Sequence, residues 1–243
     1  MEKQTSSSII NAVVARVLAA VVFLFGANQS LWAQSVAQPV LSNEQKAQLH
    51  EKAGKWVDAL ALQDAAKAAK VTGFVEQHLT AVYSWNKTHF YTDVPAGVNP
   101  RTGDQLSELD RKMIAQSAMP SSVHKTLMDS LHHYLTNEQV ARILDGYTIG
   151  KVAFTLKGYQ AIVPDLTEKE TAVILSNLEQ AREQAIDYKS MKSISAIFEI
   201  YKTKNEKYLN EHGRNWHQLF GDYVRKVKAE KKAREAAKKS GQQ

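Results

Sequence analysis

The chain has 243 residues, contains no cysteine and carries a formal net charge of +6. The absence of cysteine excludes disulfide bonds, cysteine nucleophiles and thiolate metal sites. Eight basic and only two acidic residues lie between Arg225 and Lys239, so the rest of the chain is close to neutral and we do not expect a nucleic-acid-binding protein. Contact of this basic end with an anionic surface or an acidic polysaccharide is one interpretation, and a solvated terminal helix is the other.

The first 33 residues have the order of a secretory signal peptide. An apolar run from Val17 to Ala27 follows Arg16, and the small residue Ala33 precedes the expected cleavage point. The run is shorter than the ~20 apolar residues of a membrane span. We expect residues 1–33 to be removed, residues 34–41 to form a linker, and the mature protein to be periplasmic or secreted, with no membrane span. An uncleaved N-terminal anchor is the alternative.

A short motif occurs three times, beginning at Leu41, Leu135 and Leu166. In each copy the leucine precedes a hydroxyl residue, and Gln or Glu follows three positions later. This is the spacing of a capping box, in which the hydroxyl and the longer side chain each bind a backbone N–H at the start of a helix. The motif therefore predicts where three helices begin.

Apolar residues at helical spacing predict an all-α protein. In chain order, the expected helices are Glu44–Leu60, a long segment from Asp64 past Trp85, a segment from near Gln105 to before Pro120, Val123–Tyr134, Thr136–Gly146, a short segment reaching Pro164, Thr167–Ala185, Ile194–Leu209, and a last helix from Trp216. A loop rich in Pro and Gly is expected at Asp93–Gly103. Gly146 is expected to end its helix, and Lys151–Thr155 to be extended. The sequence thus predicts a single-domain bundle of seven to nine helices over residues 42–226, followed by a basic tail at residues 227–243.

Catalytic motifs are missing from the sequence, which has no metal-binding HExxH, no phosphate-binding glycine loop and no GxSxG nucleophile. The histidines between His124 and His133 lack the spacing of metal ligands, so they are expected at the surface or the boundary of the core, and neither a metal nor a cofactor is expected. His78 lies on the apolar face of its helix, as a core histidine does. Glu183 and Asp187 are among several carboxylates that could serve glycoside hydrolysis, but nothing marks a catalytic pair.

One group of polar and aromatic residues suggests a ligand site, because sugars are bound by aromatic faces together with planar polar side chains. The group comprises Tyr147, Lys151, Tyr159, Arg182, Tyr201, Lys202 and Asn205. Irregular backbone is expected after Tyr147, and sites tend to lie on such segments. We expect Tyr147, Tyr159 and Arg182 to converge on one concave surface. In the alternative, both rings are buried and Arg182 pairs with a carboxylate.

A set of short motifs lies at Leu135–Val140, Asp145–Thr148, Lys157–Tyr159, Ile162–Thr167 and Ala181–Asp187, with the earlier segment Leu62–Val71 fitting the same pattern. Through these motifs most of the mature chain resembles the domain-of-unknown-function family 3826, a family of secreted bacterial proteins. The resemblance implies a source in Bacteroidetes-like bacteria with many polysaccharide-degrading systems. It implies no activity and no catalytic residues.

Together these observations predict a binding or accessory protein linked to carbohydrate use, with a glycan or an envelope protein as its ligand. A periplasmic helical chaperone or stress-response protein is the alternative, and a non-classical carbohydrate-active enzyme is a second one. A binding protein is favoured over an enzyme. The sequence does not indicate an oligomeric state.

Overall fold

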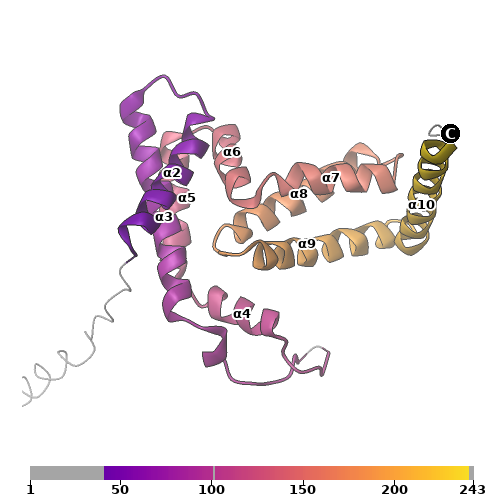
Figure 1. Ribbon diagram of the computed structural model, residues 1–243, viewed down its shortest axis with the longest axis horizontal. Coiled ribbons are helices and arrows are strands. Elements are labelled where there is room, and N and C mark those ends of the chain that lie inside the picture. Colours follow the sequence, from indigo (N-terminus) through magenta and orange to yellow (C-terminus); the bar gives the residue numbers. More distant parts are fainter. Residues whose placement is uncertain (1–40, 101, 241–243) are drawn as a thin grey trace, which may run out of the picture. The chain divides into compact units, whose positions relative to one another are not determined.

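The computed structural model describes residues 41–100 and 102–240, and these residues form nine α-helices, joined by short connections except for the long one between α3 and α4 (Figure 1). The helices are α2 (Asn43–Asp58), α3 (Ala65–Thr88), α4 (Glu108–Ser117), α5 (Ser121–Tyr134), α6 (Asn137–Thr148), α7 (Lys151–Ile162), α8 (Glu168–Ala185), α9 (Met191–Glu211) and α10 (Trp216–Ser240). Between α3 and α4 lie the 3₁₀ helix η1 (Tyr91–Asp93) and an isolated bridge from Val98 to Gln105. The all-α prediction is confirmed. The predicted signal peptide and most of the predicted linker lie outside the described residues.

The three predicted capping boxes are all present. The hydroxyls of Ser42, Thr136 and Thr167 each accept a hydrogen bond from the backbone N–H three residues later, and the Gln or Glu there binds the N–H of the cap in return. An additional box is formed by Ser107 and Asp110 at the start of α4. Because each box satisfies backbone N–H groups that have no partner within the helix, it fixes the residue at which the helix begins.

Two local predictions between α6 and α7 were wrong. Gly146 does not end α6, which continues to Thr148, and Lys151–Thr155 is helical rather than extended. The break lies instead at Ile149 and Gly150, which both have left-handed backbone, with φ of 53° and 63°. Burial of Val152 and Tyr159 on one face of α7 outweighs the weak helix propensity of that segment.

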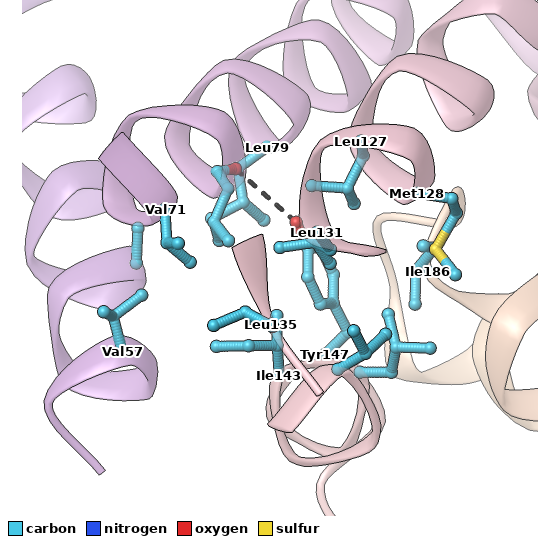
Figure 2. Close-up of a cluster of buried hydrophobic side chains, with 14 of the residues drawn as sticks. Val57, Val71, Leu79, Leu127, Met128, Leu131, Leu135, Ile143, Tyr147 and Ile186 are labelled. Atoms are coloured by element: carbon cyan, nitrogen blue, oxygen red, sulfur yellow. Dashed lines mark hydrogen bonds between the residues drawn. The ribbon is translucent and has the colours of Figure 1, made fainter. Parts of the chain in front are cut away.

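The buried side chains form two clusters. The first cluster lies among α2, α3, α5 and α6 and includes Leu131, Ile143 and Tyr147 (Figure 2). The second lies among α7, α8 and α9 and includes Tyr159 and Leu178. The helix pairs α2–α3 and α8–α9 make the most extensive contacts, one pair in each cluster.

The last helix, α10, packs against α7 and α9 only through its first turns. From Arg225 to Lys238 every side chain is exposed. The basic segment therefore continues α10 as a helix but contributes nothing to the core. Among the described helices, none combines the length and the apolar character that crossing a membrane requires.

Candidate functional site

The three residues expected to form a ligand site are all buried, and the structure does not bring them together. Tyr147 belongs to the first cluster and Tyr159 to the second. Arg182 is held by an ion pair between its Nη1 and Oδ1 of Asp145, at 3.0 Å, and Glu179 lies 3.9 Å from its Nη2. All three thus have partners within the protein, and Tyr159 also forms part of the wall of a groove.

This groove, which we call the aromatic groove, lies between α7, α9 and the start of α10 and encloses about 750 Å³. Six aromatic side chains line it, namely Phe154, Tyr159, Phe198, Trp216, Phe220 and Tyr223. Phe154 and Phe220 are 79% and 47% exposed. Several exposed apolar side chains gathered around one cavity are typical of a ligand-binding groove, because their burial by a ligand would be favourable.

The sequence of α7 explains the depth of the groove. Tyr159 is anchored to α9 by a hydrogen bond from its hydroxyl to the backbone carbonyl of Lys202, at 3.1 Å. Its ring lies against the indole of Trp216, with centroids 5.2 Å apart. Gly158 precedes it, and a β-carbon on this glycine would meet no atom within 4 Å. The missing side chain therefore leaves the groove open.

Charged side chains accompany the aromatic ones. Lys151, Lys157 and Lys202 line the groove together with Glu199 and Glu206. Nζ of Lys202 lies 3.0 Å from Glu199, and Nζ of Lys151 lies 5.6 Å from the centre of the Phe198 ring. Burial raises the pKa of Glu206, an effect that Lys202 opposes and Glu199 reinforces. Aromatic faces and hydrogen-bonding charged groups thus occur within one cavity.

A second cavity, which we call the polar cleft, encloses about 490 Å³ between the end of α4, the start of α5, the last turns of α8, and α9. Its lining includes His124, Glu183 and Asp187. Oδ2 of Asp187 lies 2.9 Å from Nδ1 of His124, and Oδ1 lies 3.0 Å from Nε2 of His78. Nδ1 of His78 in turn lies 3.1 Å from the hydroxyl of Tyr147. A line of hydrogen bonds therefore runs from the first cluster to the cleft.

Three residues of this network, Asp187, His124 and Tyr147, have shifted pKa values. Burial raises the pKa of Asp187, but the hydrogen bonds from His124 and His78 outweigh burial and hold that pKa below its ordinary value. The hydrogen bond to Asp187 raises the pKa of His124, although burial opposes the shift and Glu183 adds to it. Burial raises the pKa of Tyr147 well above its ordinary range, so its hydroxyl remains protonated.

Sequence reasoning missed the histidine pair. It placed His124 at the surface or the boundary of the core and treated His78 as a core residue, and it considered Asp187 only among carboxylates that could serve glycoside hydrolysis. His78 is indeed buried, but its acid partner lies 109 positions away. Within the described residues, no three His, Asp or Glu side chains are grouped so as to hold a metal ion.

The family model described as "Protein of unknown function (DUF3826)" matches residues 46–229. The match begins inside α2 and ends inside α10, so it includes the first cluster except Leu41, the whole second cluster, the aromatic groove and the polar cleft. No curated protein matches the chain.

Proposed function

We propose that this chain, which belongs to the DUF3826 family of proteins of unknown function, binds a carbohydrate in the aromatic groove and serves carbohydrate use at the cell envelope as an accessory protein. The observation that carries the proposal is the exposure of Phe154 and Phe220 on a groove walled by Tyr159 and Trp216. The envelope location rests on the predicted signal peptide at residues 1–33.

The chemistry of a sugar ring suits this groove. A pyranose presents patches of C–H groups, which pack on aromatic faces, and hydroxyls, which bind charged and carbonyl groups. The groove offers both kinds of partner, and its volume is in the range of about 300–1,000 Å³ usual for ligand pockets. Three lysines against two glutamates give its lining a slight positive excess, which also tolerates an acidic sugar.

Calorimetric titration of the full chain with a panel of plant and host polysaccharide fragments tests the proposal. We expect Phe154→Ala and Phe220→Ala each to weaken binding of the best fragment at least tenfold, which corresponds to about 1.4 kcal/mol. Gly158→Leu should abolish binding, because the new side chain projects into the groove from a position where its β-carbon meets no atom within 4 Å. The matched control is Phe90→Ala, since Phe90 is 55% exposed but lies outside the groove. Absence of heat with every fragment, or an equal loss in the Phe90 variant, would contradict the proposal.

A helical chaperone is the second candidate, favoured by the same exposed apolar side chains. Its test is suppression of the aggregation of a denatured client at a near-stoichiometric ratio. A carbohydrate-binding protein has no reason to suppress this aggregation. The five charged side chains in the groove favour a polar ligand over an unfolded apolar segment.

A further inference from the structure

The polar cleft shares no lining residue with the aromatic groove and therefore requires its own explanation. Its wall carries three carboxamides, from Gln116, Gln180 and Gln184. It also carries the carboxylates of Glu183 and Asp187, but no Lys or Arg is among its lining residues. A phosphate, sulfate or uronate would find two negative charges and no fixed positive one, so the cleft suits a neutral ligand.

His124 presents one nitrogen to this cleft in a fixed orientation. An ionised carboxylate only accepts hydrogen bonds, so the atom of His124 that faces Asp187, Nδ1, must carry a hydrogen. Nε2 is then the basic nitrogen of the neutral ring. It lies 3.6 Å from Oε1 of Glu183, and both residues line the cleft. A carboxylate that fixes the tautomer and orientation of an imidazole is the arrangement that general-base catalysis uses.

The other oxygen of Asp187 is also occupied, because it accepts from Nε2 of the buried His78. With both oxygens bound to imidazoles, Asp187 is a positioning residue and cannot also act as a nucleophile or acid. Glu183 is then the one carboxylate among the lining residues that does not have both oxygens bound to imidazoles. Glycoside hydrolysis needs two, so the cleft is better suited to a reaction driven by the imidazole.

One buried polar group in the wall of the cleft lacks a hydrogen-bond partner. Gln116 is only 8% exposed and donates a hydrogen bond from its Nε2 to Oδ1 of Asn86, at 2.6 Å. Its buried Oε1 has no hydrogen-bond partner among the described residues. Buried polar atoms are nearly always paired, and this oxygen is closed to solvent, so a donor that enters the cleft could pair with it only after a small movement of the Gln116 side chain.

We propose that the polar cleft is a hydrolytic site in which His124 activates a water molecule for attack on a neutral carboxylic ester. Nε2 takes a proton from the water while its oxygen bonds to the ester carbonyl carbon. Carboxamide N–H groups of Gln180 or Gln184 stabilise the resulting oxyanion. The bond from this carbon to the alcohol oxygen then breaks, and the imidazolium returns its proton to that oxygen. One ester and one water thus give one carboxylic acid and one alcohol.

The pH dependence follows from the same geometry. The titratable groups that face His124 are Glu183 and Asp187, with Tyr188 and Tyr201 elsewhere in the lining and His78 behind Asp187. The hydrogen bond to Asp187 raises the pKa of His124, and burial opposes this shift. Since only the neutral imidazole can take a proton, the rate should rise as the pH rises through this pKa and then level off.

The test is hydrolysis of 4-nitrophenyl acetate by the full chain, with 4-nitrophenyl phosphate as the charged counterpart. We expect cleavage of the acetate and none of the phosphate. His124→Gln should lower kcat/KM for the acetate by at least ~100-fold, the usual contribution of a general base. The matched control is His132→Gln, because His132 is exposed on the same helix, α5, and lies outside the cleft.

Asp187→Asn tests the positioning role, and its readout is the pH–rate profile. It should lower the rate and shift the midpoint of the profile to lower pH, because the negative partner of His124 is lost. Since Asp187 lies in a buried network, Glu183→Gln at an exposed position provides a second variant, which should shift the midpoint in the same direction by a smaller amount. A wild-type rate no higher than that of free imidazole, or an unchanged rate in His124→Gln, would overturn the proposal. Ester hydrolysis and the heat of glycan binding are measured separately on the wild-type protein. The proposal of a hydrolytic site in the polar cleft and the proposal of carbohydrate binding in the aromatic groove can therefore fail independently.

Discussion

Gly146 lies so close to Trp56 that a β-carbon on Gly146 would be 2.6 Å from Cδ2 of the indole. The glycine lies in the last turn of α6, and Trp56 belongs to α2. The indole also lies against Tyr147, with ring centroids 4.6 Å apart. The glycine therefore serves to let two helices approach each other and has no role in ending α6.

Gly146→Ala should lower the free energy of unfolding by about 1–3 kcal/mol, because the indole must move away from its place in the first cluster. The helix propensity of alanine would have the opposite effect, about 1 kcal/mol of stabilisation. The control is Gly73→Ala in α3, where a β-carbon meets no atom within 4 Å and propensity alone should act. Urea unfolding of both variants measures the difference. Equal stabilisation by both changes would show that the contact with Trp56 costs nothing to relieve.

Tyr147→Phe should destabilise the protein by about 1–3 kcal/mol, because Nδ1 of the buried His78 would lose its partner. The ring itself stays, so packing in the first cluster is preserved. Tyr134→Phe is a suitable control, since no hydrogen bond of its hydroxyl is found within the described part of the chain. Thermal unfolding followed by circular dichroism compares the two. A larger loss in the Tyr134 variant would be incompatible with the network described for His78.

The ion pair between Arg214 and Glu170 should make the free energy of unfolding depend on pH in the acid range. Hydrogen bonds from Arg214 lower the pKa of the buried Glu170 to about 2. A lowered pKa in the folded state contributes stability above the unfolded value of ~4.3, and this stability is lost as the pH falls toward 2. Arg214→Gln should thus be less stable by on the order of 2–3 kcal/mol above pH 5, and the gap should narrow toward pH 2.

The control for this experiment is Arg225→Gln, which removes an exposed ion pair with Asp222. Exposed pairs contribute only ~0–1 kcal/mol, so this variant should follow the wild type at every pH. Urea unfolding at several pH values between 2 and 7 provides the data. A gap between wild type and Arg214→Gln that stays constant over this range would rule out the linkage.

Truncation after residue 227 should leave the melting temperature within a few degrees of the wild type, because every side chain from Arg225 to Lys238 is exposed. The helical signal in circular dichroism should fall by the contribution of the removed turns only. A large drop in melting temperature would mean that the end of α10 packs against the protein.

Helix positions could be predicted from the sequence because their determinants are local. A capping box such as that of Thr136 and Gln139 acts over three residues, and the apolar spacing of a helix is visible within four. The position of the break at Ile149 could not be predicted, because the burial of Val152 and the contact of Gly146 with Trp56 are tertiary.

The sites were harder to predict for the same reason. His124 and Asp187 are 63 positions apart, and no local pattern links them. The aromatic groove was predicted only in part, through Lys151, Tyr159 and Lys202, because Trp216 and Phe220 come from a helix whose packing the sequence does not reveal.

The two buried clusters meet at consecutive residues, since Ala185 belongs to the second and Ile186 to the first. A peptide bond joins these two residues, so local unfolding of one cluster at this point must also displace the backbone of the other cluster. The protein should accordingly lose its structure in one concerted step, despite having two centres of packing. Amide hydrogens of α3 and α9 should exchange with solvent at similar rates in their most protected positions, because both are released by the same global opening.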